Sequence, residues 1–578
     1  MLKKLLPYTK GYRPWIALGI ACSAMDAIFQ LLIPLVMADI VDIGVANADT
    51  GFIVRKGLLM VVLAVVAMAF GLGSAASSAR AGMGFGANLR TAEYARVQGF
   101  SFSNIEKFST ASLVTRLTSD VRVLEMTLMM SMRLLVRAPV MLVAALVLAV
   151  RLSSQLSRVF LGAIPLLVIF VVLLMTKVGP LFRLLQEKTD DVNLVVQENL
   201  TGIRVVKSFV REEHEKEKFS KRNNSLRETS EKAFGAVVVN MPVMMLIIYG
   251  TIIAVMWFGG KMVFAGTMEV GGLTAFFSYI TEILISLMMV SMIFMMMSRS
   301  IACAKRICEV LDEVPSVTDA QAKNGVAVKS GSVDFENVSF RYNGESAGWV
   351  LEDVSLHIPA GSTVGILGGT GSGKSTLVSL IPRLYEAQKG SVLVGGRPVA
   401  DYTMEHLRDA VSVVLQKNTL FSGTIRENLL WGNPDATEDQ LLAACRSACA
   451  DEFLDRMPEG LDTDLGQGGV NVSGGQKQRL CIARAILKQP KILILDDSTS
   501  AVDTATDAKI REAFRRDLPG TTKLIIAQRI SSIADADLIL VLDKGRVVAQ
   551  GSHEELMKNC EIYQDVYLSQ QEGVSISG

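Results

Sequence analysis

The stretch Gly368-Gly-Thr-Gly-Ser-Gly-Lys-Ser375 decides the fold of the second half of the chain. It fits the pattern G-x-x-x-x-G-K-[S/T], follows a strand-like run at 363–367 and precedes a helical run at 376–381. In this context the backbone N–H groups of a glycine-rich loop surround phosphate oxygens, a lysine reaches the outer phosphates and a hydroxyl ligates Mg²⁺. The predicted nucleotide site comprises Gly368, Gly369, Thr370, Gly371, Ser372, Gly373, Lys374, Ser375 and Thr376.

Two further motifs extend this site. The apolar run 491–495 ends in Asp496, and a carboxylate at the end of a strand beside the phosphate loop is where the magnesium shell needs one. Upstream, Val472-Ser-Gly-Gly-Gln476 precedes a helical run and forms a second anion cradle. Because the phosphate loop of the chain already holds its own γ-phosphate, this second cradle is free to cap a nucleotide held by another domain. The residues of the cradle are Val472, Ser473, Gly474, Gly475 and Gln476.

The composition divides the chain into a membrane half and a soluble half. Hydrophobic residues make up 50% of the 578 residues, mean hydropathy is +0.37, and the apolar residues concentrate in the first half. The 58 basic and 57 acidic side chains nearly cancel, which excludes a bulk charge that would attract nucleic acid. Seven cysteines without a CxxC pair, and only four histidines, indicate reduced packing cysteines rather than a zinc site.

Six apolar runs are long enough to cross a bilayer, which takes about 20 residues. The inner segments carry 24 lysines and arginines and the outer loops carry five, so the N-terminus and the soluble half are expected in the cytosol, in a multi-pass protein of the cell (plasma or inner) membrane. Asp26 interrupts the first run and Glu282 the sixth. The runs are 14–38, 57–79, one that is uncharged from 138 to about 150, 159–176, 235–258 and 270–298.

Two inner connections, 80–137 and 181–241, are too long for structureless loops and contain no proline. We expect helices two to five to continue through them into the cytosol as stalks. The fold class is therefore a polytopic α-helical membrane domain, with six spans and long cytosolic helical extensions, fused to an α/β P-loop nucleotide-binding domain. The predicted domains are a cytosolic elbow at 1–14, the membrane domain at 15–300, a linker at 301–332, the nucleotide-binding domain at 333–567 and a tail at 568–578.

These motifs together resemble the ABC transporter family, specifically a half-size exporter that joins one six-helix membrane domain to one nucleotide-binding domain. The resemblance covers nearly the whole chain and implies ATP and Mg²⁺ as cofactors, with hydrolysis between two head-to-tail nucleotide-binding domains. Tyr342, in Val338-Ser-Phe-Arg-Tyr342, resembles the aromatic residue that stacks on adenine. Gln416 resembles the glutamine that joins magnesium to the membrane interface, and Asp503 resembles the D-loop aspartate. Regions 102–120 and 198–215 are similar to the coupling-helix regions of the family.

Two positions depart from the pattern of this family. Where the family has a glutamate that polarises the attacking water, this chain has Asp497, and where it has the switch histidine, this chain has Gln528. His553 lies too far along to substitute. A carboxylate drawn back by about a bond length misses the same water, and losing a positioned base lowers the rate by ~10²–10⁴-fold. The expected arrangement is a heterodimer, in which a second half-transporter supplies the glutamate and histidine of the working site.

The cargo is less defined by the sequence. Twelve of the 27 methionines lie within 241–297, where flexible thioethers suit either a surface that repacks around apolar ligands or gap-filling between helices. Asp26 and Glu282 either attract a cationic substrate or have a paired structural role. The favoured function is an exporter subunit for amphipathic, drug-like molecules in contact with membrane lipid. A lipid or siderophore translocator and an ATP-gated, non-transporting regulator are the alternatives.

Overall fold

A computed structural model describes residues 2–323, 325–342, 348–497 and 502–575, without the side chains at 2, 175, 290–296, 298 and 572–575. The chain divides into two compact units. One consists of residues 1–98 and 110–313, and the other of residues 99–109 and 314–578. Among the described residues, the first unit is helical and the second contains ten strands.

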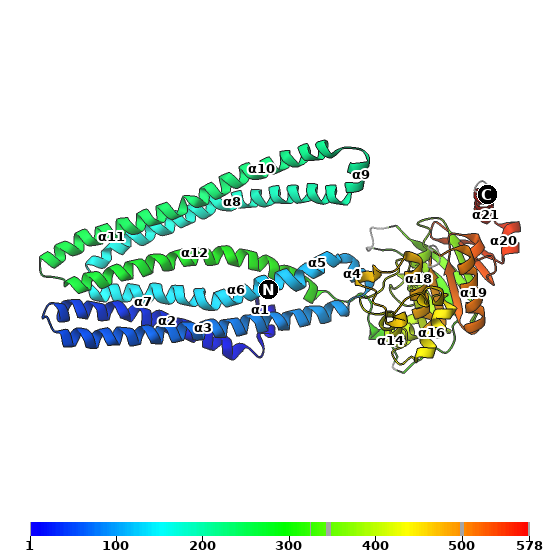
Figure 1. Cartoon of the computed structure of the whole chain (residues 1–578), viewed down its shortest axis with the longest axis horizontal. Helices are drawn as coiled ribbons and strands as arrows, with labels where there is room; N and C mark the ends of the chain where they lie inside the picture. Colours follow the sequence, from blue (N-terminus) through cyan, green and yellow to red (C-terminus); the bar gives the residue numbers. More distant parts are fainter. Residues whose placement is uncertain (1, 324, 343–347, 498–501, 576–578) are drawn as a thin grey trace. The chain divides into compact units, whose positions relative to one another are not determined.

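Six helical segments of the first unit are long and apolar enough to cross a membrane (Figure 1). The prediction of six spans is therefore confirmed. The segments are Arg13–Val45, Thr50–Gln98, Thr110–Leu152, Leu156–Thr201, Glu212–Phe264 and Val270–Met289. The helices of the unit are α1 (Leu2–Leu5), α2 (Arg13–Asp39), α3 (Thr50–Gln98), α5 (Thr110–Thr115), α6 (Val121–Met130), α7 (Val136–Leu152), α8 (Phe160–Thr201), α9 (Ile203–Ser208), α10 (Glu212–Val238), α11 (Asn240–Phe264) and α12 (Val270–Asp312), with short turns η1 (Leu6–Thr9), η2 (Ile40–Val45), η3 (Arg116–Asp120), η4 (Ser131–Leu135) and η5 (Leu156–Val159).

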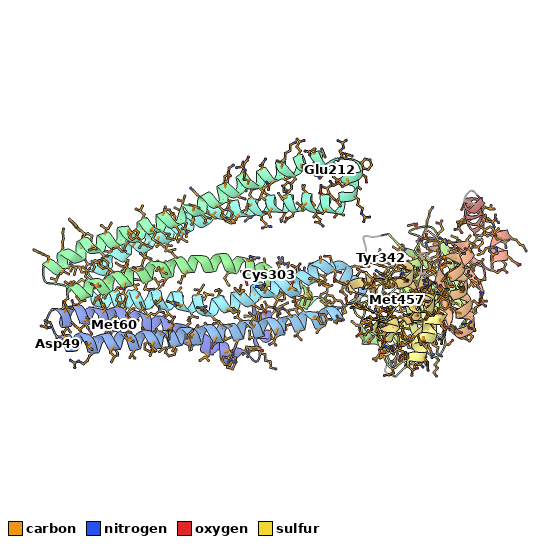
Figure 2. All side chains as sticks on the ribbon, viewed as in Figure 1. Asp49, Met60, Glu212, Cys303, Tyr342 and Met457 are labelled. Atoms are coloured by element: carbon orange, nitrogen blue, oxygen red, sulfur yellow. The ribbon has the colours of Figure 1, made fainter. Side chains whose placement is uncertain are left out.

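Several of these helices are much longer than a bilayer is thick. The 49 residues of α3 and the 42 residues of α8 correspond to about 74 Å and 63 Å at a rise of 1.5 Å per residue. The hydrocarbon core measures about 30 Å, so the predicted helical extensions are confirmed. α8 and α10 lie side by side and α9 joins their ends, next to Glu212 (Figures 1 and 2). α12 continues through Asp312, into the range 301–332 for which the sequence predicts a linker.

The outer ends of the first and sixth spans are joined by one carboxylate. Asp42, in the π-helical turn η2, accepts hydrogen bonds from the backbone N–H groups of Gly271 (2.5 Å) and Gly272 (3.0 Å). These donors belong to the first turn of α12, where the helix leaves N–H groups without partners and favours a negative charge. A Cβ on Gly271 would lie 2.4 Å from the carbonyl oxygen of Ala38, so the close approach requires glycine there.

The second unit places a six-stranded sheet beside a four-stranded one. The larger sheet has the order β10-β9-β3-β8-β7-β6, in which only β10 is antiparallel to its neighbour, and the smaller has the order β2-β1-β4-β5. One apolar core lies between the sheets, and a second lies between the larger sheet and the helices that cover it. The strands are β1 (Val333–Phe340), β2 (Leu351–Ile358), β3 (Thr363–Gly368), β4 (Lys389–Val394), β5 (Arg397–Pro398), β6 (Val411–Val414), β7 (Ile492–Asp496), β8 (Thr522–Ile526), β9 (Leu538–Asp543) and β10 (Arg546–Gly551). The helices are α4 (Phe102–Lys107), α13 (Lys374–Leu380), α14 (Met404–Ala410), α15 (Ile425–Leu430), α16 (Glu438–Ser447), α17 (Asp451–Leu454), α18 (Gly474–Leu487), α19 (Thr504–Asp517), α20 (His553–Asn559) and α21 (Glu561–Ser575).

The register of the larger sheet determines where chemistry can occur. β3, β8 and β7 are adjacent and parallel, so their carboxyl ends share one edge. The phosphate loop follows β3, Asp497 follows β7 and Gln528 lies just beyond β8. The fold therefore brings the phosphate loop together with two positions that lie more than a hundred residues further along the sequence.

All seven cysteines are free and buried. Burial raises the pKa of Cys445 to about 12 and also raises the pKa of Cys481. The interpretation of the cysteines as reduced packing residues therefore agrees with the structure.

Candidate functional site

The glycine-rich loop runs from the carboxyl end of β3 to the first residue of α13. Gly373, immediately before the helix, has φ of +96°, a left-handed conformation that a side chain would strain. The ammonium of Lys374 donates hydrogen bonds to the carbonyl oxygens of Gly368 (2.8 Å) and Gly369 (2.7 Å). Burial lowers the pKa of Lys374, because its charge is poorly solvated there. A phosphate group beside the loop would stabilise that charge.

Asp496 and Ser375 form the adjoining part of the site. Ser375 donates from its Oγ to Oδ1 of Asp496 at 3.0 Å, and Asp496 is 8% exposed. Burial raises the pKa of Asp496, the hydrogen bond from Ser375 opposes this rise, and the charge of Asp497 adds to it. A hydroxyl and a carboxylate, completed by phosphate oxygens and water, are the oxygen donors that Mg²⁺ prefers. Residues 2–323, 325–342, 348–497 and 502–575 contain no cluster of three or more His, Cys, Asp or Glu suited to a metal. The donor set therefore fits a magnesium ion held jointly with a nucleotide.

The two residues that depart from the family pattern contact each other. Gln528 donates from Nε2 to Oδ2 of Asp497 at 2.8 Å. Asp497 has φ of +49° and donates its backbone N–H to Ile526 at the end of β8, which holds the two strand ends together. His553 is the first residue of α20, and its Nδ1 lies 2.7 Å from the hydroxyl of Tyr563. That histidine therefore has its own partner within the C-terminal helices.

A residue that no motif marks, Gln570, holds the backbone around Gln528. Gln570, on α21, donates from Nε2 to the carbonyl oxygen of Gln528 (2.8 Å) and accepts at Oε1 from the N–H of Ile530 (2.9 Å). It lies in the range 568–578, for which the sequence predicts a tail. A single glutamine in a polar helix has no pattern that predicts such a contact.

Tyr342 lies against the helix that follows the phosphate loop. Its hydroxyl is 2.9 Å from Oγ1 of Thr376, and its ring meets that of Tyr385 at 5.2 Å in an edge-to-face arrangement. Tyr385 donates to Oε1 of Glu106 (2.5 Å) and its ring lies 6.0 Å from that of Phe102, both in α4. The segment predicted to contain a coupling helix thus includes a helix that packs on the nucleotide-binding unit. Tyr385 and Glu106 carry no motif and were not predicted.

The remaining predicted residues lie on separate elements. Gln416 follows β6, is exposed, and makes no hydrogen bond with Ser375 or Asp496. Ser473 caps α18: its N–H donates to Oε1 of Gln476 (2.8 Å), and its Oγ accepts from the N–H of Gln476. Asp503 caps α19 by accepting from the N–H and hydroxyl of Thr506, and these bonds lower the pKa of Asp503. Residues 498–501, which include part of the predicted D-loop, lie outside the described residues.

The two intramembrane acids have different surroundings. Asp26 is buried, pairs with Arg137 at 2.9 Å, and accepts from Nε2 of Gln30 at 2.8 Å. Arg137 also donates to Oε1 of Gln30 (2.6 Å), which closes a three-residue network. Glu282 is partly exposed and has no hydrogen bond or ion pair with any described residue. The paired arrangement of Asp26 favours a structural role, whereas Glu282 has no comparable partner.

We expect Arg137→Gln to destabilise the membrane unit, because it leaves the carboxylate of Asp26 buried without its positive partner. A fully buried pair loses about 3–5 kcal/mol in this way, and about 1–3 kcal/mol is expected here because Arg137 is 32% exposed. Adding Asp26→Asn should recover most of the loss. Thermal unfolding of the two variants in detergent measures the difference, and equal or additive losses would contradict the pairing.

Comparison with known proteins identifies the family. The profile of the ABC transporter transmembrane region matches residues 16–288, and the ABC transporter profile matches residues 351–500. The uncharacterized ABC transporter ATP-binding protein YfiB of Bacillus subtilis is 37% identical over 98% of this chain and 98% of its own. The ATP-dependent lipid A-core flippase of Desulfotalea psychrophila is 33% identical over 84% of this chain and 85% of its own. The structure of a bacterial Atm1-family ABC exporter with ATP bound matches with a TM-score of 0.82 and 25% identity, over 96% of this chain and 99% of that one.

The chain belongs to the ABC transporter family. It is a half-size exporter, with a six-span membrane domain followed by an α/β domain that binds ATP and couples its hydrolysis to transport. It is a multi-pass protein of the inner membrane, and its nucleotide-binding domain lies in the cytosol.

Proposed function

We propose that this chain is the weakly hydrolysing half of a two-chain exporter. It binds ATP with Mg²⁺ at Lys374, Ser375 and Asp496, and Tyr342 supports the adenine ring. Its own site turns over slowly because Asp497 and Gln528 occupy the two catalytic positions. Its cradle Val472–Gln476, together with Asp503, completes the working site of a different half-transporter that carries the glutamate and the histidine.

The hydrogen bond between Gln528 and Asp497 is the observation that carries this proposal. The side chain of Asp497 is one methylene shorter than that of a glutamate, and its Oδ2 already accepts a hydrogen bond from the amide of Gln528. Gln528 cannot take up a proton, so it cannot bring positive charge to the γ-phosphate as negative charge develops there. Both substitutions therefore weaken hydrolysis at this site while the contacts that bind phosphate are kept.

The cradle retains the geometry of an anion site. Ser473 and Gln476 form a capping box at the start of the 14-residue helix α18. Among the described residues, no atom other than those of the neighbouring residues and of the helix's own backbone lies within 4 Å of the position that a Cβ on Gly474 would occupy, so the helix N-terminus is open to a ligand. A helix start with free N–H groups favours a negatively charged group. These features support a role for the cradle at a nucleotide bound by another chain.

The arm formed by α8, α9 and α10 supports assembly with a second chain. Its apolar residues are strongly exposed, and Phe209 and Val210, beyond the end of α9, are 72% and 80% exposed. Side chains of this size gathered at the tip of an arm indicate a surface that is covered in the assembled protein. The other large apolar residues exposed by 60% or more on α8, α9 and α10 are Leu161, Leu194, Leu200, Val205 and Val238.

The test of the proposal uses the complex of this chain with the half-transporter that co-purifies with it. Ser473→Arg should lower ATP hydrolysis by about 10²–10³-fold, as removal of a transition-state donor does, because it blocks the partner's γ-phosphate. Asp497→Asn is the matched control in the chain's own site and should change hydrolysis by less than about twofold. The reverse pattern, or purification of an active complex made only of identical chains, would refute the proposal.

For the cargo, we propose an amphipathic small molecule that carries a positive charge and is recognised by Glu282. Glu282→Gln should slow transport of a lipophilic cation by about tenfold, the effect of one partly screened charge contact, and leave its neutral analogue unchanged. Asp26→Asn is the matched control, because Asp26 is already paired with Arg137. Transport in proteoliposomes measures both, and equal effects on the cation and its neutral analogue would remove the hypothesis.

Lipid translocation is the second candidate function. Two lipid A-core flippases are at least 32% identical to this chain over 82% or more of its length, which supports a lipid cargo on the same scaffold. Movement of labelled lipid between leaflets, dependent on ATP, distinguishes this function from drug export. Transport of a siderophore in the same assay would point to the third cargo class. ATP binding without transport of any of these would favour an ATP-gated regulator.

A further inference from the structure

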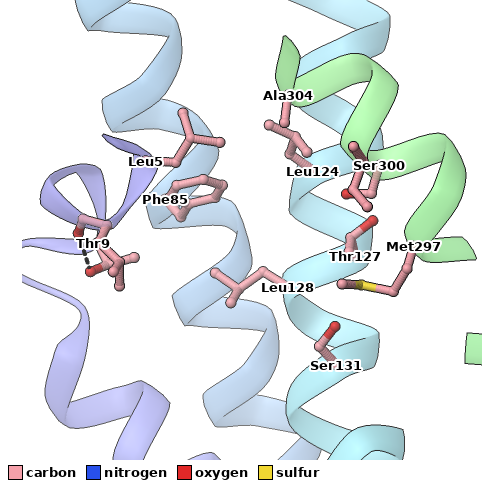
Figure 3. Close-up of a pocket in the computed structure, with 12 residues that line it drawn as sticks. Leu5, Thr9, Phe85, Leu124, Thr127, Leu128, Ser131, Met297, Ser300 and Ala304 are labelled. Carbon is pink, nitrogen blue, oxygen red and sulfur yellow. Dashed lines mark hydrogen bonds between the residues drawn. The ribbon is translucent and has the colours of Figure 1, made fainter. Parts of the chain in front are cut away.

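The membrane unit contains a cavity of about 290 Å³ that neither Asp26 nor Glu282 lines. It lies between the N-terminal segment α1–η1 and helices α3, α6 and α12 (Figure 3). The four elements are also joined by an apolar cluster that includes Leu5, Phe85 and Leu124, which line the cavity. The cavity is therefore lined by parts of the chain that are far apart in sequence.

The wall of the cavity is apolar even where threonines line it. Thr9 donates its hydroxyl to the carbonyl oxygen of Leu6 (2.7 Å), and Thr127 donates to that of Val123 (2.7 Å). Because both hydroxyls are satisfied by their own backbone, these residues have little polarity left to offer a ligand. An apolar cavity of about 150 Å³ stays dry and binds a benzene-sized ligand, and this one is larger. The chemistry of the wall therefore favours a hydrocarbon occupant over water.

The cavity lies on the cytosolic side of the membrane-spanning part of α3. Phe85 lies six residues beyond the apolar run 57–79, or about 9 Å further along α3, towards the cytosol. Leu6 lines the cavity, yet 54% of its surface is exposed. An exposed leucine on a short N-terminal segment at the level of the headgroups is expected to face hydrocarbon. The cavity can then be reached from the cytosolic leaflet.

Polar and basic groups near the cavity suit the ester groups and the anionic headgroup of a phospholipid. Among residues with described side chains, Ser131 and Ser300 line the cavity and have no hydrogen-bond partner, so their hydroxyls can bind ester oxygens (Figure 3). Lys3 lies in α1, Lys10 directly follows η1 and Arg13 begins α2; all three are exposed and form no ion pair with described residues. Lys4, by contrast, is paired with Asp312 at 2.7 Å. Basic residues beside the cytosolic leaflet attract anionic lipids.

We propose that this cavity binds one acyl chain of an anionic phospholipid from the cytosolic leaflet, with the headgroup held by Lys3, Lys10 and Arg13. The bound lipid attaches the N-terminal segment to α3, α6 and α12 as a resident component of the protein. It is distinct from the cargo, so the inference holds whichever substrate is transported.

The test uses the full chain in its native complex, in nanodiscs that contain phosphatidylglycerol with a photoactivatable acyl chain. Peptides that cover 124–131 and 297–304 should carry the label. Ser131→Phe and Ala304→Phe each fill the cavity and should reduce this label by roughly tenfold, as expected when about two methylene groups lose their burial. Leu161→Phe, at a residue that is 78% exposed on α8, is the matched control and should leave the label unchanged.

A second arm tests the headgroup. Phosphatidylcholine that carries the same photoactivatable acyl chain should label the cavity less than phosphatidylglycerol does. Replacing Lys3, Lys10 and Arg13 by glutamine should remove this difference, because each charge removed should lower the labelling by phosphatidylglycerol by roughly fivefold. If both phenylalanine variants fail to fold, a competition experiment on the wild type replaces them. Unlabelled phosphatidylglycerol should then suppress labelling of the cavity but not labelling of the exposed surface of α8. Equal labelling of α8 and the cavity, no effect of folded phenylalanine variants, or labelling that requires ATP turnover would each overturn the proposal.

Discussion

Purified copies of this chain alone should hydrolyse ATP slowly, and Asp497→Glu combined with Gln528→His should raise the rate by ~10²-fold or more. The longer carboxylate reaches the position where a base can polarise water, and the histidine supplies a group that can carry positive charge beside the γ-phosphate. The double substitution also removes the hydrogen bond that now joins the two positions. Release of inorganic phosphate by the full chain in nanodiscs measures the gain.

The matched control for this gain is Asp497→Asn combined with Gln528→His. It breaks the same hydrogen bond and introduces the same histidine, but it supplies no base, so its rate should remain as low as that of the wild type. Brisk hydrolysis by the unmodified chain would contradict the proposed weakness of its site. A double variant that folds, binds ATP and stays inactive would show that the defect lies elsewhere.

Lys374→Ala should weaken ATP binding by about ten- to a hundredfold, the range expected for the loss of hydrogen bonds to a charged group. The physical reason is visible in the loop: the ammonium is poorly solvated, so its pKa is lowered, and phosphate oxygens are its natural counter-charge. Titration of a fluorescent ATP analogue into the full chain measures the affinity.

The comparison variant for ATP binding is Asp497→Asn, which should leave the affinity within about twofold because this residue occupies the position of the base and does not hold the phosphates in the proposed arrangement. The two variants together separate binding from turnover. Equal loss of affinity in both would mean that Asp497 takes part in holding the nucleotide, and the assignment of a weakened but nucleotide-binding site would then fail.

Hydropathy and motif spacing are sufficient to predict the architecture of this chain. The number of spans depends on runs of about 20 apolar residues, which few other structures produce. The phosphate loop and Asp496 are predictable because nucleotide binding needs glycines, a lysine, a hydroxyl and a carboxylate at the carboxyl ends of adjacent strands. The parallel order of β3, β8 and β7 then places these residues together.

Contacts that depend on a single ordinary side chain could not be predicted. Gln570 bonds to the backbone on both sides of Arg529, and Tyr385 joins Tyr342 to Glu106, but neither lies in a recurring pattern. The sequence also left open whether Asp26 is paired. Its partner, Arg137, is 111 residues away, and only the packing of α2 against α7 brings the two side chains together.

The burial of all seven thiols has a practical consequence for spectroscopy. A thiol reacts with a maleimide or a nitroxide reagent as the exposed thiolate, and buried cysteines are inert. One cysteine introduced at Val210, at the tip of the arm, can therefore be labelled without first removing the native ones. Distances between this label and one placed on the arm of the partner half-transporter would then report how far the arms move during transport.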